Sequence, residues 1–103
     1  MSEEQPIWEL RQGETIIGAL TVYDEDMGWY SAHFEATPAF DRHRALFTEG
    51  TQVRVGEDAE CWQDWHARVR QLELQLVRLA DSASTGDFLL YIDGRDADFR
   101  PKM

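Results

Sequence analysis

The chain has 103 residues, 43% of them hydrophobic, and its twenty acidic and ten basic residues give a formal net charge of −10. The length fits one domain, and this hydrophobic content indicates a folded chain with its own core and excludes disorder. The negative field repels nucleic-acid backbones and anionic membranes, so neither is expected as a partner; it favours solubility or a basic protein partner.

The ends of the chain and its cysteine content predict the compartment. Cys61 is the only cysteine, so no internal disulfide can form. Residues 1–6 are polar and acidic, do not resemble a secretory leader and are expected to be flexible. No apolar run approaches the ~18 residues of a membrane span. We therefore expect a single soluble, cytoplasmic domain over residues 1–103.

Three strands are predicted in the first third of the chain. Residues 7–11 and 15–23 flank a hairpin loop at 12–14. Apolar residues on both faces of 15–23 predict an interior strand. An acidic loop at 24–28 then leads to a third strand over 29–36.

The next segment predicts a helix with a clear start signal. Thr37 is a favourable N-cap and Pro38 a favourable first helical residue. The helix is expected over Ala39–Glu49, with Gly50 as its C-terminal stop. Residues 51–55 are β-branched and are predicted to be an extended connector.

A second helix is predicted to open at residues 56–58, with acidic residues at its positive end. Four apolar residues recur at helical spacing and predict one buried stripe. They are Trp62, Trp65, Val69 and Leu72.

Residues 72–80 fit either a strand or an extension of that helix. Leu76 and Leu79 continue the helical stripe, but the same residues alternate as a strand does. We predict a strand, because the apolar run 88–92 would then have a partner on each side, and residues 81–87 form the loop between them.

The closing segment predicts a hairpin. An apolar run from Phe88 meets Asp93-Gly94 and returns to Arg100, which places Ile92 opposite Arg95. One face is expected to lie against the core: Phe88, Leu90, Ile92, Ala97 and Phe99. The resulting order β-β-β-α-α-β-β-β predicts an α+β domain with a mostly antiparallel sheet and two helices packed on one face.

Three short segments carry a resemblance. Trp-Glu-Leu at 8–10, Phe-Glu-Ala-Thr-Pro-Ala-Phe at 34–40 and Phe-Leu-Leu-Tyr-Ile-Asp-Gly at 88–94 are similar to small uncharacterised bacterial proteins of unassigned function. The resemblance spans nearly the full chain and favours the strand at 72–80. It implies no activity.

The first candidate site combines an acidic run with an aromatic residue. Asp24, Glu25 and Asp26 precede Trp29 closely. Such carboxylates hydrate a turn, or they face a cation or a basic partner, and aromatic anchors dominate interface energetics. This set predicts a partner-binding surface.

The alternative site is a ligand pocket that includes Tyr30, His33 and Glu35. Glu35 lies among aromatic residues, which could raise the pKa of its carboxyl for acid–base work. The pocket predicts a small-molecule binder or an enzyme if these polar groups converge on one cavity.

No metal or cofactor is predicted. Asp93, Asp96 and Asp98 resemble a calcium loop only superficially, because Gly94 follows the first of them directly and no closing Glu is present. The chain contains no phosphate-binding or dinucleotide-binding glycine motif.

The histidines and the cysteine lack the spacing of a site. His33, His43 and His66 show no pairing typical of zinc, and Cys61 and His66 point to different sides of their predicted helix. Cys61 is expected to pack as a small apolar group.

These patterns favour a small, acidic, non-enzymatic interaction module that binds a basic protein. A third possibility is an acidic mimic of nucleic acid, although the acids gather in turns and helix starts instead of along one face. The chain is expected to be a monomer or a homodimer, the latter paired through an edge strand at residues 7–11.

Overall fold

A computed structural model describes residues 6–56 and 58–102. The flexibility expected for the N-terminus concerns mainly residues 1–5, which lie outside this part. Pro6 is held against the sheet, since its carbonyl accepts a hydrogen bond of 2.9 Å from the Val22 amide.

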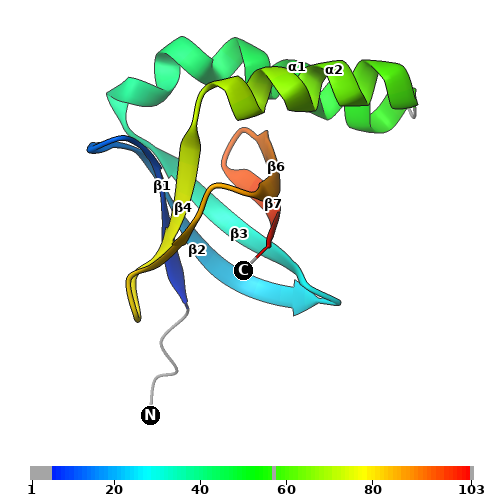
Figure 1. Cartoon of the computed structure of the whole chain (residues 1–103). Helices are drawn as coiled ribbons and strands as arrows, with labels where there is room; N and C mark the ends of the chain where they lie inside the picture. Colours follow the sequence, from blue (N-terminus) through cyan, green and yellow to red (C-terminus); the bar gives the residue numbers. More distant parts are fainter. Residues whose placement is uncertain (1–5, 57, 103) are drawn as a thin grey trace.

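The α+β prediction is confirmed: one curled antiparallel sheet is accompanied by two helices (Figure 1). The sheet has seven strands in the order β5-β4-β1-β2-β3-β7-β6. Its strands are β1 (Ile7–Gln12), β2 (Thr15–Asp26), β3 (Trp29–Ala36), β4 (Leu74–Arg78), β5 (Ala83–Thr85), β6 (Phe88–Asp93) and β7 (Asp96–Pro101). The helical elements are the 3₁₀ helix η1 (Pro38–His43), α1 (Arg44–Gly56) and α2 (Ala59–Gln71).

The curl of the sheet is visible in one aromatic contact. Trp8 on β1 and Phe99 on β7 are separated by two strands, so a flat sheet would hold them about 14 Å apart. Their ring centroids are 5.4 Å apart. The sheet therefore wraps around its own side chains, and both residues are almost fully buried in that concave interior.

The helices lie side by side across one end of the curled sheet (Figure 1). They cover β6, an edge strand whose Leu90 and Ile92 are buried with the interior residues. Tyr91, on the opposite face of β6, stacks on Trp65 of α2 with 5.5 Å between ring centroids. β6 is thus buried on both faces although only β7 pairs with it.

The predicted boundary of the first helix is wrong. Residues 38–43 form η1, and α1 continues through Gly50 and the predicted connector to Gly56. Gly50 is needed for contact, not for a stop, because a Cβ there would lie 2.2 Å from Cζ2 of Trp65. Val53 packs against the core, so tertiary contact outweighs the strand propensity of residues 51–55.

The two helix starts use different bonds. Pro38 begins η1 as predicted, but the Thr37 hydroxyl donates to the carbonyls of Ile16 and Ile17 instead of capping the helix. At the second start the Asp58 carboxylate accepts from the amides of Glu60 and Cys61. Asp58 is therefore the N-cap of α2.

Two predictions about strands need correction. Asp24–Asp26 belong to β2, and the loop shrinks to the turn Met27-Gly28, where both residues have positive φ. β1 lies between β4 and β2, so the edge strand expected at residues 7–11 is an interior strand. The buried face of β1 explains this position, since Trp8 and Leu10 contact the core.

The strand predicted within 72–80 is confirmed as β4, but for a different reason. β4 pairs with β1 and with the short β5, which forms inside the predicted loop 81–87. It does not pair with β6, which the helices bury instead.

The closing hairpin is confirmed with a shifted turn. Asp93 pairs with Asp96, and the two turn residues are Gly94, with φ +61°, and Arg95. This is the conformation of a turn with glycine at its first central position. Ile92 therefore pairs with Ala97, two residues beyond the predicted Arg95. Because this shift is an even number of residues, each side chain keeps its predicted face.

Candidate functional site

A row of side chains crosses the outer face of four neighbouring strands. Asp24 on β2 pairs with Ser31 on β3, Ser31 with Asp98 on β7, and Asp98 with Tyr91 on β6. Directly paired residues share one face of an antiparallel sheet. The Ser31 hydroxyl donates to Oδ1 of Asp98 at 3.1 Å, which orients this carboxylate.

Tyr91, one end of this row, is packed against aromatic residues of α2 and β3. Its ring stacks on Trp65 and, at 6.1 Å between centroids, on Trp29. Its hydroxyl accepts a hydrogen bond from the indole N–H of Trp62. Two helix residues and one strand residue therefore hold Tyr91, which is only 9% exposed.

Arg54 of α1 lies over Tyr91. The guanidinium carbon is 4.5 Å from the Tyr91 ring centroid and 5.9 Å from that of Trp29. Its Nη1 donates to Oδ2 of Asp98 at 2.9 Å. The Asp98 carboxylate thus uses one oxygen for Ser31 and the other for Arg54.

Two adjoining hollows share Arg54 and Tyr91, and together we name them the Tyr91 groove. One hollow, of about 340 Å³, also touches Val55 and the carboxylate-bearing residues Asp93, Asp96 and Asp98. The other, of about 310 Å³, lies between α1 and the start of α2. It is lined by Val53, Arg54, Asp58, Ala59, Trp62, Gln63 and Tyr91.

The structure divides the predicted partner-binding set. Asp24 and Asp26 are paired with Ser31 and Trp29 and share the outer face with the Tyr91 groove. Glu25 is paired with Tyr30 on the opposite face. Trp29 is half-buried, with the Arg54 guanidinium carbon 5.9 Å from its ring centroid, so it lies beside the groove and does not stand free in solvent.

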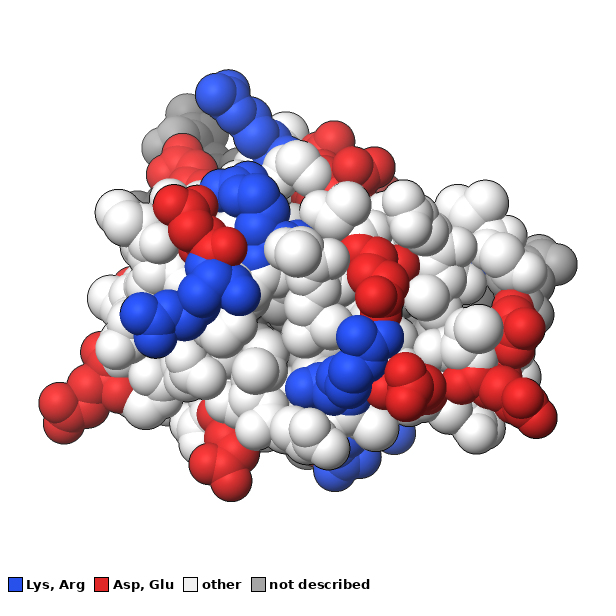
Figure 2. All heavy atoms as spheres, turned by 90° about the horizontal axis from the view of Figure 1, so that it is seen from above, with Lys and Arg blue, Asp and Glu red and all other residues white. Residues whose placement is uncertain are grey.

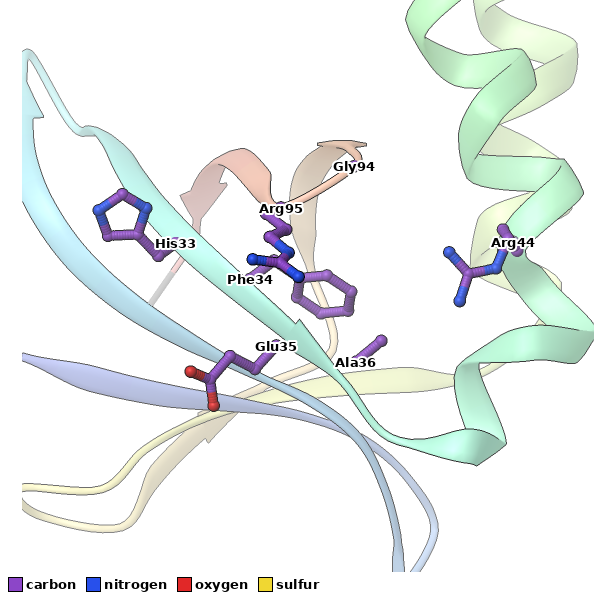
Figure 3. Close-up of a pocket in the computed structure, with 7 residues that line it drawn as sticks. All are labelled: His33, Phe34, Glu35, Ala36, Arg44, Gly94 and Arg95. Carbon is purple, nitrogen blue, oxygen red and sulfur yellow. The ribbon is translucent and has the colours of Figure 1, made fainter.

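The residues of the alternative pocket do not converge. His33 and Glu35 line an open hollow of about 710 Å³ with Arg44 and Arg95, but Tyr30 does not line it. Figure 3 shows His33 and Glu35 pointing away from Arg44, which lies across the hollow on α1.

Tyr30 points into the sheet interior, where its ring stacks on Phe99. Burial, followed by the neighbouring Glu25 carboxylate, raises the pKa of the Tyr30 phenol. Tyr30 is therefore a half-buried residue that packs against the core on the other side of β3 from His33 and Glu35.

His43, His66 and Cys61 have different surroundings. His43 is 7% exposed and its Nε2 lies 3.2 Å from Oε1 of Gln12, whereas His66 stacks on Trp62. Cys61 is exposed on α2, so its predicted apolar packing is wrong. Among residues 6–56 and 58–102, no three His, Cys, Asp or Glu side chains are placed to hold a metal ion.

The surface over the helices carries both signs of charge. Figure 2 shows basic and acidic side chains next to each other across this face, with acidic groups gathered at the right-hand end, where α1 and α2 join. Asp58 and Glu60 lie at that junction. The charge of −10 is therefore spread over several regions, and the Tyr91 groove is one of them.

Sequence reasoning did not find the groove: it placed the partner-binding set at Asp24–Asp26 and Trp29, considered the hairpin aspartates that line the groove only as a calcium loop, and missed Arg54 and its position over Tyr91. Arg54 fell in the segment predicted to be an extended connector. The pairing of Tyr91 with an aspartate of the returning strand was the available signal, because it places an aromatic ring beside a carboxylate. The continuation of α1 through residues 51–56 places the Arg54 guanidinium beside Tyr91 and Asp98.

None of the helices in the described part of the chain is both long enough and apolar enough to cross a membrane. No protein-family model, no curated protein and no solved structure matches the chain, so its relationship to other proteins stays a prediction.

Proposed function

We propose that this protein is a non-enzymatic interaction module that binds a basic segment of a partner protein in the Tyr91 groove. The observation that carries the proposal is the Tyr91 ring, which stacks on Trp29 and is bordered in the groove by three aspartates of the closing hairpin. Cationic side chains are attracted both to aromatic faces and to carboxylates.

The charges around the groove support a basic partner. Asp93 and Asp96 are exposed at its rim, Asp98 lines its floor, and Asp24 and Asp26 extend the same face of the sheet. The negative field of the whole chain would speed the approach of a cationic partner.

The shape of the groove fits an extended segment better than a small molecule. Its two hollows are open and adjoin at Arg54 and Tyr91, with apolar contact available at the exposed Val55 and the half-buried Trp62 beside the carboxylates. In the hollow near His33 and Glu35 these two side chains point away from Arg44, so it carries no second proposal (Figure 3).

Fluorescence anisotropy with two labelled peptides of equal length, one rich in Arg and one rich in Glu, tests the proposal. We expect the basic peptide alone to bind, and added salt to weaken it because the contacts are ionic. The triple variant Asp93→Asn, Asp96→Asn, Asp98→Asn should bind at least about tenfold more weakly.

A charge-matched variant separates the groove from the total charge. Glu14→Gln, Asp41→Asn, Asp64→Asn makes the same change in net charge at exposed positions that do not line the groove. Equal weakening in both variants would show attraction by net charge alone and would contradict binding in the groove.

A further inference from the structure

Arg54 makes two contacts that a bound arginine would make. Its guanidinium lies over the Tyr91 ring and donates to Oδ2 of Asp98. Stacking on an aromatic face and bonding to a carboxylate are the two modes by which proteins recognise guanidinium groups. The chain's own side chain therefore occupies a position with the chemistry of an arginine site.

The residues below Arg54 are held without it. Trp62 and Trp65 fix Tyr91, and the Ser31 hydroxyl fixes Asp98. If the Arg54 side chain swung away, the ring face and the carboxylate oxygen would keep their positions. A preorganised site of this kind binds its ligand at a low ordering cost.

Arg54 is more exposed to solvent than the groups that it contacts. Its side chain is 46% exposed and extends from the last turns of α1, whereas Tyr91 is 9% exposed. Arg54 also lies where the two hollows of the groove adjoin, since it lines both. Its departure would join them into one continuous channel over Tyr91.

We infer that an arginine of the bound partner segment replaces Arg54 over Tyr91 and Asp98, so that Arg54 acts as an internal competitor. This inference rests on the proposed function. It specifies that the recognised group is a guanidinium. It also means that Arg54, by competing for the site, lowers the affinity for weakly basic segments. A lysine ammonium would fill the site less well, because it lacks the planar group that stacks on Tyr91.

The test compares four chains, the native one and three variants, against two probes: a peptide of alternating Arg and Gly, and one of alternating Lys and Gly. We expect Arg54→Ala to bind the arginine peptide about tenfold more tightly than the native chain, because an intramolecular stacked ion pair no longer competes. Arg54→Lys, which keeps the charge, should fall between the two. Arg70→Ala is the control, since Arg70 is exposed on α2 and does not line the groove.

The Arg54 Nε–H signal in NMR spectra of the ¹⁵N-labelled full chain reports the displacement directly. Bound to unlabelled arginine peptide, this signal should move toward the position of a free arginine. Equal affinity of Arg54→Ala and Arg70→Ala, or an unmoved Arg54 signal in the complex, would overturn the competitor role. Such a result would leave the proposed function intact if the aspartate variants still weakened binding. Absence of binding to either peptide in all four chains would overturn both the competitor role and the proposed function.

Discussion

Gly50 lies directly under the indole ring of Trp65, and a Cβ on Gly50 would be 2.2 Å from Cζ2 of that ring. This contact sets how closely α1 and α2 approach. It also places Trp65 to stack on Tyr91, the residue around which the candidate site is built. The packing of the two helices and the geometry of the groove are therefore coupled.

Gly50→Ala should lower the free energy of unfolding. Overpacking of this kind costs about 1–3 kcal/mol, while alanine gains about 1 kcal/mol in helix propensity, which leaves a net loss of about 0–2 kcal/mol. We expect the upper end of this range, because the added Cβ would overlap a buried ring. Urea unfolding followed by tryptophan fluorescence measures it. Gly56→Ala in the same helix is the control, because a Cβ there meets nothing within 4 Å. A neutral Gly50→Ala would contradict the close contact.

His43 should make stability depend on pH. Burial, with a smaller effect of Arg42, lowers the pKa of His43 below 6.5. Below pH 6.5 the unfolded chain then binds more protons than the folded one, so the free energy of unfolding falls as pH falls. The slope reaches at most about 1.4 kcal/mol per pH unit until the folded-state pKa is passed.

Thermal unfolding of the native chain and of His43→Gln between pH 7.5 and pH 5 tests this dependence. Glutamine retains a donor toward Gln12 but does not titrate. We expect a shallower decline in the variant, and identical slopes would exclude His43 as the cause.

Tyr91→Phe should separate stability from binding. The change removes the acceptor of the Trp62 indole N–H and is expected to cost about 1 kcal/mol of stability. The aromatic face that receives the guanidinium stays, so affinity for the arginine peptide should change by less than about twofold. Tyr91→Leu should lose most of that affinity, and equal behaviour of the two variants would argue against stacking.

Asp98→Asn should have the opposite pattern, with a larger effect on peptide binding than on stability. Its pair with Arg54 is partly exposed, so we expect a stability change below about 1 kcal/mol but about tenfold weaker peptide binding. Asp41→Asn is the matched control, since Asp41 also bonds one arginine, Arg44, at 2.9 Å on the surface. Weakening of the same size in both variants would contradict a specific role for Asp98.

The sequence was sufficient for the elements whose signals are local. Alternation and turn residues predicted the strands of the first third and the closing hairpin, and the acidic start of α2 agreed with its N-cap at Asp58. The buried and exposed faces of the hairpin were predicted correctly although its register was not. The turn lies one residue further along the chain, which shifts the pairing by two residues and leaves every side chain on its face.

The misplaced features depend on contacts between distant residues. Gly50 has the signature of a helix stop until Trp65 is known to lie over it. β6 is buried by α1 and α2, which lie earlier in the chain. No pattern within residues 88–93 could therefore show which element covers this strand. The position of Arg54 over Tyr91 required both of these facts.

The most direct test of binding in the Tyr91 groove is a titration of the ¹⁵N-labelled chain with the arginine peptide, followed at the four tryptophan indole N–H signals. Trp62 lines the groove and Trp29 contacts Arg54 and Tyr91, whereas Trp8 is enclosed in the sheet and the Trp65 indole donates to the Leu46 carbonyl in the core. We predict saturable shifts of the Trp29 and Trp62 signals with little change at Trp8 and Trp65. Shifts absent from Trp29 and Trp62, or confined to residues remote from the groove, would contradict this account.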